Sequence, residues 1–231
     1  MTIHGLNKTT LLDYPGRVAA TVFTGNCNFR CPFCHNAELV LNPDSEPVIS
    51  IEEFTAFLKK RQGIIEGVCI TGGEPTLQPD LFDFIKLIRS FGYPVKLDTN
   101  GYRPQVLRQA LDEGLLDYVA MDIKSGPTGY KEASGCANLN IDTIRESVEL
   151  IKNSGIDYEF RTTVVKGIHK DSDFVEIGEW LGEVKAYFIQ NYRDNENVMV
   201  KGYDSFTDAE LEHIKNILLP YIPNVRIRGE D

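Results

Sequence analysis

Short apolar runs alternate along the chain with longer amphipathic stretches, and this alternation constrains the fold more than any other feature of the sequence. Runs that predict strands lie at 17–24, 68–71, 95–98, 118–123, 158–165, 186–190 and 225–227. A helical pattern opens at Ser50, and others cover 80–91, 104–113, 142–154, 171–181 and 207–219. Several strand runs are apolar on both faces, as is typical of parallel strands covered by helices. The sequence therefore predicts an α/β fold with about seven strands, in an open sheet or a partly closed barrel.

The length of the chain, 231 residues, lies within the range of one domain, so we expect a single domain over residues 1–231. The longest irregular segments are 42–48, 125–137 and 192–206. Loops of this length inside a domain often have a function.

Charge and cysteine usage exclude several classes of protein. The formal net charge of -10, from 34 acidic and 24 basic side chains, disfavours non-specific binding to nucleic acid.

No run of about 18 apolar residues is present, so we expect no membrane-spanning helix. The N-terminal segment lacks the basic and apolar parts of a secretory signal, and we expect a cytoplasmic protein. Three of the five cysteines lie close together, which favours metal chemistry in a reducing compartment over disulfides.

Polar and thiol side chains follow five of the predicted strands at their carboxyl ends. The segments are 27–34, 72–75, 98–101, 122–124 and 190–191. In parallel α/β folds these strand ends meet on one face, where the ligand site lies. The sequence therefore predicts one site to which all five segments contribute.

The first of these segments holds Cys27, Cys31 and Cys34 in the spacing C-x3-C-x2-C. Three thiolates on one short loop can hold three corners of a cubane iron–sulfur cluster, which leaves the fourth iron open to another ligand. The alternatives are a structural zinc site, with the adjacent His35 as a fourth ligand, and a group of buried thiols. Because adjacent residues rarely point at the same ion, we favour the cluster.

Two motifs together resemble the radical S-adenosylmethionine (radical SAM) superfamily. One is the cysteine loop with Phe33 just before its last cysteine, and the other is Gly72-Gly73-Glu74-Pro75 after the second predicted strand. The resemblance implies a partial (β/α)6 barrel of the TIM type. It also implies one [4Fe–4S] cluster whose open iron binds the amino and carboxylate groups of S-adenosylmethionine (SAM). The reduced cluster then splits SAM into methionine and a 5′-deoxyadenosyl radical.

Further segments are similar to the activating enzymes of glycyl-radical enzymes, and most of all to the activators of anaerobic ribonucleoside-triphosphate reductase. These segments are 5–16, 24–27, 34–36, 97–101 and 121–124. The resemblance implies that the radical passes to one glycine of a partner enzyme, and that a flavodoxin-like or other low-potential protein supplies the electron. The segment from Cys34 to Gly72 lacks the cysteine-rich insert of some activators, so we expect a single cluster.

The resemblance assigns the cysteine loop to the cluster and to the cofactor. Cys27, Cys31 and Cys34 are expected to ligate the cluster. Phe33, Cys34 and His35 are expected to line the cofactor. The same reading places Gly72, Gly73 and Glu74 at the methionine end of SAM, where glycine lets the backbone approach a ligand closely. A tight turn into a helix would also explain this second motif.

Charged residues are expected near the carboxylate of SAM. Asp98, Thr99 and Asp122 match a place that holds a monovalent cation in some relatives. Two carboxylates beside an anionic ligand end need positive charge between them, which supports such a cation. Lys124 and Arg161 would add positive charge there, although an ordinary salt bridge at a strand end explains them equally well.

Four further residues have weaker assignments. Gln190 and Asn191 could touch the adenine or ribose of SAM, and Asp13 lies where relatives place the glycine-bearing loop of the partner. A simple Asp-Tyr-Pro-Gly turn is an alternative for Asp13. Cys69 is expected to be a packed apolar side chain inside a strand.

Other functions remain open at this point. Within radical chemistry, the chain could activate pyruvate formate-lyase or another glycyl-radical enzyme, or act on a small molecule as a deazaguanine-type synthase does. From a different class, a zinc-binding structural module would need a tetrahedral site and no reductive chemistry.

Overall fold

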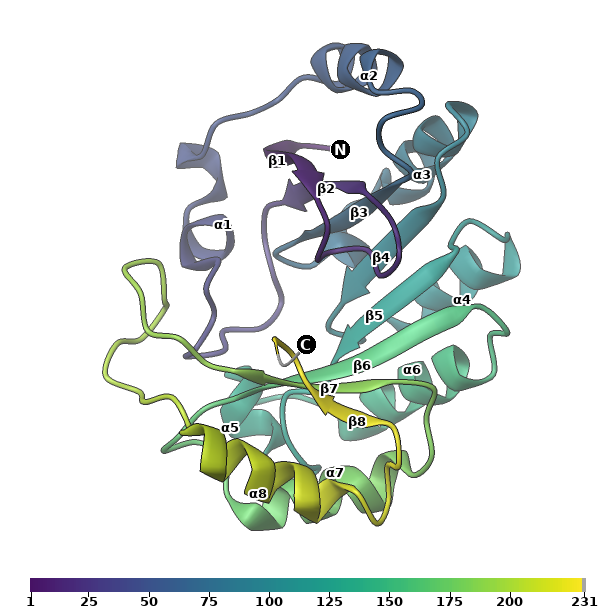
Figure 1. The fold of residues 1–231 in the computed structure, drawn as a ribbon. Helices are drawn as coiled ribbons and strands as arrows, with labels where there is room; N and C mark the ends of the chain where they lie inside the picture. Colours follow the sequence, from purple (N-terminus) through teal and green to yellow (C-terminus); the bar gives the residue numbers. More distant parts are fainter. Residues whose placement is uncertain (230–231) are drawn as a thin grey trace.

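Eight strands within residues 1–229 form one sheet, in which they follow one another in sequence order (Figure 1). The computed structural model describes these residues, and positions 230–231, the end of the domain expected over 1–231, lie outside the described residues. Strand β1 is antiparallel to β2, and every later pair of neighbours is parallel. The strands are β1 (Ile3–Thr10), β2 (Ala19–Thr24), β3 (Gly67–Gly72), β4 (Val95–Thr99), β5 (Tyr118–Asp122), β6 (Asp157–Val164), β7 (Tyr187–Asn191) and β8 (Val225–Ile227).

The sheet curves into a partial barrel, with strands on the inner side and helices around the outside (Figure 1). In the part of the chain that the structure describes, no pairing joins β8 to β1, so the barrel stays open between its two edge strands. The predicted α/β fold and its partial barrel are therefore confirmed. All seven predicted strands are present, and β1 is an addition. Its sequence, IHGLNKTT, is buried only at its two ends, so it gives no apolar run.

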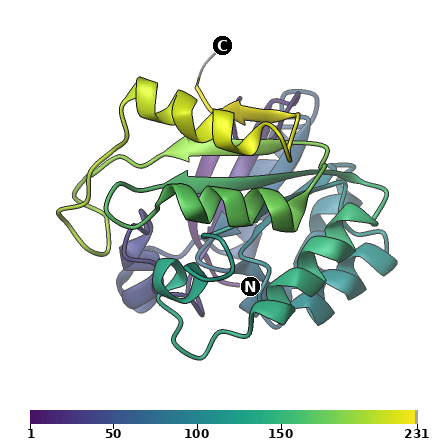
Figure 2. The ribbon, with the colours of Figure 1, turned by 90° about the horizontal axis from the view of Figure 1, so that it is seen from below.

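Helices connect the parallel strands and cover the outer face of the sheet. Figure 2 shows α7 and α8 side by side along the end of the sheet. The helices are α1 (Ala37–Leu41), α2 (Ile51–Lys60), α3 (Leu81–Ser90), α4 (Pro104–Asp112), α5 (Tyr130–Ser134), α6 (Ile141–Lys152), α7 (Asp171–Leu181) and α8 (Asp208–Leu218), with short 3-10 turns at Pro43–Ser45 and Pro75–Leu77. Every predicted helix is present, whereas α1 and α5 lie in stretches without a helical pattern. Within residues 1–229, no helix combines the length and apolar character needed to cross a membrane.

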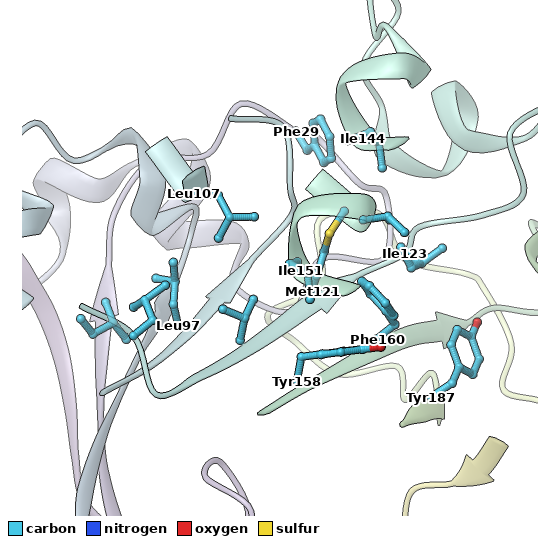
Figure 3. Close-up of a cluster of buried hydrophobic side chains, with 14 of the residues drawn as sticks. Phe29, Leu97, Leu107, Met121, Ile123, Ile144, Ile151, Tyr158, Phe160 and Tyr187 are labelled. Atoms are coloured by element: carbon cyan, nitrogen blue, oxygen red, sulfur yellow. The ribbon is translucent and has the colours of Figure 1, made fainter. Parts of the chain in front are cut away.

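Alternating side chains give the strands two different faces. Leu97, Met121 and Phe160 belong to the buried apolar cluster that includes Leu107 of α4 and Ile144 of α6 (Figure 3). Their neighbours in sequence belong to the opposite face, because successive residues of a strand point to opposite sides. That face is charged, with Lys96, Asp98, Glu159 and Arg161. Strands β4 and β6 are therefore not among the strands with two apolar faces, and the inner face of the sheet is charged at these two strands.

Candidate active site

A cavity of about 430 Å³ lies at the carboxyl ends of the strands. This volume is in the range of small-molecule sites. The structure brings nearly all of the predicted site residues to its wall. They are Cys27, Cys31, Phe33, Cys34, His35, Gly72, Gly73, Glu74, Asp98, Thr99, Asp122, Lys124, Arg161 and Gln190.

Three thiols face this cavity from the loop after β2. Burial raises the pKa of Cys27 to about 12 and that of Cys31 to about 11, with Glu74 adding to the shift at Cys27. Both side chains are therefore neutral thiols until a metal ion binds, because a coordinating thiol is deprotonated by the ion. Among the described residues, no three His, Cys, Asp or Glu side chains are already arranged around a common metal position.

The neighbourhood of the thiols fits a cluster better than zinc. His35, the residue considered as a fourth zinc ligand, has its Nε2 atom 2.8 Å from the carbonyl oxygen of Arg193. Its ring stacks on that of Tyr192, with 5.5 Å between the centroids. Three thiols without a fourth protein ligand are the donor set that leaves one iron of a [4Fe–4S] cluster open.

Two segments from distant parts of the chain hold the cysteine loop in place. On one side, the backbone N–H of Arg30 donates to Ser134 O at 2.9 Å, at the end of α5. On the other side, Met199 N donates to Cys34 O at 3.1 Å and Val200 N to Pro32 O at 2.8 Å. These last two bonds make residues 199–200, within the loop between β7 and α8, a strap on the cysteine loop. Figure 1 shows this loop in yellow-green beside the segment that leads into α1.

We expect Val200→Pro to weaken this strap, because proline removes the N–H that bonds to Pro32 O. The side chain of Val200 is 46% exposed, so little packing is lost with it. The free energy of unfolding should fall by about 1 kcal/mol, and iron bound after reconstitution should fall with it. Val200→Ala keeps the N–H and is the matched control. Equal iron content in both variants would show that the strap does not hold the loop.

The Gly72–Gly73 pair lies against the start of the cysteine loop. Gly72 has a φ of +119°, and a Cβ atom there would lie 2.3 Å from backbone atoms of Thr24. A Cβ atom at Gly73 would lie 1.9 Å from Asn26 O. Asn36 Nδ2 also donates to Gly72 O at 3.0 Å. Glycine is thus required at both positions by the close approach of two loops, whether or not a ligand is bound.

The side chain of Glu74 joins its own segment to residues 99–100 at the end of β4. Its side chain is 1% exposed. Oε1 accepts hydrogen bonds from Thr76 N at 3.1 Å and from Thr99 Oγ1 at 2.8 Å, and Oε2 accepts one from Asn100 N at 2.7 Å. Burial raises the pKa of Glu74, against the lowering effect of these hydrogen bonds. Most of its acceptor capacity is used within the protein, so its direct role toward SAM stays a prediction.

A network of charged side chains crosses the cavity floor. Arg161 Nη2 donates to Asp98 Oδ2 at 2.9 Å, and Arg161 Nε donates to Asp122 Oδ1. Lys124 Nζ donates to Asp122 Oδ2 at 2.9 Å, and Lys96 forms an ion pair with Asp98. The guanidinium of Arg161 therefore supplies the positive charge between the two carboxylates. A monovalent cation at this place stays a prediction, but the charge argument no longer supports it.

The remaining predicted residues lie at the edge of the site. Asn191 is outside the cavity wall. Its Nδ2 atom donates to Phe206 O at 2.7 Å, and its Oδ1 atom accepts from Phe206 N at 3.0 Å. It therefore closes the loop that contains residues 199–200. Asp13 lines the cavity and accepts a hydrogen bond from Thr21 Oγ1 at 2.5 Å.

Sequence reasoning missed three groups of residues around the site. Lys96 and Glu159 were included in strand runs, although a charged residue at alternate strand positions is a signal of a polar inner face. Residues 199–200 carry no motif, because they hold the cysteine loop through backbone N–H groups, which almost every residue type has. Asn100 lies within segment 98–101 but was not assigned a role, and it is part of the cavity wall.

Comparison with known proteins places the chain in a family. A sequence profile described as the radical SAM superfamily matches residues 21–181. The chain belongs to the radical SAM superfamily. A Methanocaldococcus jannaschii protein with the provisional name of glycyl-radical enzyme activating enzyme is 31% identical over 98% of this chain and 95% of its own length. The pyruvate formate-lyase-activating enzyme of Clostridium pasteurianum is 30% identical over 87% of this chain and 81% of its own.

These relatives place the radical SAM chain within the glycyl-radical enzyme activating group, as its motifs predicted. The group consists of oxidoreductase-type enzymes whose partner is a glycyl-radical enzyme, and the superfamily implies a [4Fe–4S] cluster and SAM. Among solved structures, Streptococcus suis SuiB is 13% identical with a TM-score of 0.66, over 91% of this chain. The chain spans 49% of SuiB, and this likeness shows the shared fold alone.

Proposed function

We propose that this radical SAM enzyme generates the glycyl radical of anaerobic ribonucleoside-triphosphate reductase. The observation that carries the proposal is the single cavity in which three thiols, a charged network and the strand ends meet. The reductase is favoured as the partner because segment 5–16 resembles the activators of that reductase. Residues 35–71 hold only α1, α2, a 3-10 turn and most of β3, with no second cysteine group, which disfavours the activators that carry a cysteine-rich insert. The one cysteine of that stretch, Cys69, is fully buried in β3.

The residues of the chain have distinct tasks in this reaction. When bound, the cluster and SAM supply a 5′-deoxyadenosyl radical after one electron arrives from a low-potential donor such as a flavodoxin-like protein. Cys27, Cys31 and Cys34 hold the cluster. Lys124 uses one of its three N–H groups in the hydrogen bond to Asp122. The other two N–H groups would bind the carboxylate of SAM.

The partner's glycine gives up one Cα hydrogen atom in the final step. That hydrogen atom would go to the 5′ carbon of the adenosyl group that SAM supplies, which would leave 5′-deoxyadenosine and a backbone radical on the partner. Asp13, at the cavity wall, is the residue that we assign to the glycine-bearing loop.

Activation of pyruvate formate-lyase is the second candidate, because an activating enzyme of that lyase is among the relatives. We would mix the reduced, iron-reconstituted chain and SAM with either purified reductase or purified lyase, without oxygen. Electron paramagnetic resonance then measures the glycyl radical, with a glycine-to-alanine partner as the control. A radical on the reductase alone is expected. A radical on the lyase alone would replace the first candidate by the second.

A further inference from the structure

The side chain of Asn100, just after β4, lies against one cluster ligand. Its Nδ2 atom is 3.7 Å from Cys27 Sγ and 2.9 Å from Asn28 Oδ1. The residue is 6% exposed. Its backbone N–H is fixed by the bond to Glu74 Oε2 at 2.7 Å. Asn100 is therefore a buried, firmly held donor to a sulfur atom.

Backbone geometry fixes which end of this amide faces the sulfur. The backbone N–H of Tyr102 donates to Asn100 Oδ1 at 3.0 Å. Because a backbone N–H requires an acceptor, the oxygen of Asn100 must face Tyr102, and the NH₂ group must face Cys27.

The same reasoning extends to Asn28. Its Oδ1 atom accepts from Asn100, so its own NH₂ group points elsewhere. Asn28 Nδ2 is buried and, within residues 1–229, is one of two buried side-chain atoms without a hydrogen-bond partner, His4 Nδ1 being the other. Asn28 is not part of the cavity wall, so its contribution to the site is to hold the Asn100 amide through its Oδ1 atom.

We propose that Asn100 and Asn28 form a donor relay that raises the reduction potential of the cluster. Asn100 donates one N–H to the Cys27 sulfur, and Asn28 Oδ1 accepts the other N–H and holds the Asn100 amide in that position. Reduction adds negative charge to the sulfur atoms, so N–H donors stabilise the reduced state more than the oxidised one. The relay makes the cluster easier for a donor protein to reduce. This inference rests on the cluster assignment of the proposed function.

The test is the midpoint potential of the reconstituted cluster, measured without SAM and without a partner enzyme. Asn100→Ser removes the amide donor but keeps an oxygen that can accept from Tyr102 N, as in a Ser turn. Loss of one charge-assisted hydrogen bond should lower the equilibrium constant for reduction about tenfold, which is about 59 mV toward more negative potential. Asn28→Ala should shift the potential in the same direction.

Gln78→Met is the matched control, because Gln78 Nε2 donates to Gly25 O at 2.9 Å, near the cysteine loop but not to sulfur. Its potential should equal that of the wild type. If the Asn100→Ser chain binds no cluster, the midpoint potential of the Asn28→Ala chain is the test of the relay. Unchanged potentials in the variants, or an equal shift in Gln78→Met, would overturn the relay while leaving the proposed function intact. A wild-type chain that never assembles four irons would overturn both.

Discussion

Replacing Cys31 by alanine is expected to abolish the four-iron cluster and, with it, all cleavage of SAM. Cys31 is the most buried of the three thiols, at 6% exposure, and its Sγ atom lies 3.6 Å from Ser134 O. His35 is not free to take its place, because its Nε2 atom is bonded to Arg193 O. Iron and sulfide analysis after anaerobic reconstitution measures the first effect, and 5′-deoxyadenosine measures the second.

Cys136→Ala is the matched control for this prediction. Cys136 is half-buried like Cys27 and Cys34 but is not part of the cavity wall. Its variant should keep wild-type iron content and wild-type cleavage. A Cys31→Ala chain that still holds four irons per molecule would remove Cys31 from the ligand set.

Replacing Arg161 by methionine is expected to destabilise the fold by about 3–5 kcal/mol, because removal of one partner from a buried ion pair leaves uncompensated charge. Arg161 is 14% exposed at its side chain and bridges Asp98 and Asp122. Denaturant unfolding of the metal-free, reduced protein near pH 7 measures the effect. Arg161→Lys keeps the positive charge, so its free energy of unfolding should fall by less than that of Arg161→Met. Wild-type stability in the methionine variant would show that the bridge is not needed for folding.

The loss caused by Arg161→Met should depend on pH. Burial alone would raise the pKa of Asp122, but the nearby Arg161 and Lys124 outweigh burial and hold that pKa well below its usual range. A lowered carboxyl pKa contributes stability that is complete above about pH 4 and is lost below it. In the variant the stranded carboxylates take up protons more readily. The difference in stability should therefore narrow as the pH falls from neutrality toward about 4.

The alternation of strands and helices was readable from the sequence because each element buries one apolar stripe or run. The exceptions have physical causes. β1 is an edge strand with exposed polar residues in its middle, and α5 has only five residues, too few for a helical period. Lys96 lies inside an apolar run, where its charge is matched by Asp98 from two residues further along the strand.

The part of the candidate site that depends on residue type at the strand ends could be predicted from the sequence. The thiols and the paired glycines lie at strand ends, so topology alone brings them together. Positive charge from Arg161 and Lys124 near Asp98 and Asp122 was expected from the sequence, but the sequence could not show that the Arg161 guanidinium lies between the two carboxylates. The strap at residues 199–200 depends on backbone hydrogen bonds across more than 160 positions, which no local pattern records. The cofactor contacts assigned by resemblance stay predictions.

The measurement that tests the account most directly is formation of 5′-deoxyadenosine by the purified chain alone. The protein would be prepared without oxygen, reconstituted with iron and sulfide, reduced and mixed with SAM. Four irons per chain and release of 5′-deoxyadenosine are the predicted result. A colourless protein that binds one zinc ion through the three cysteines and leaves SAM intact would contradict the radical mechanism.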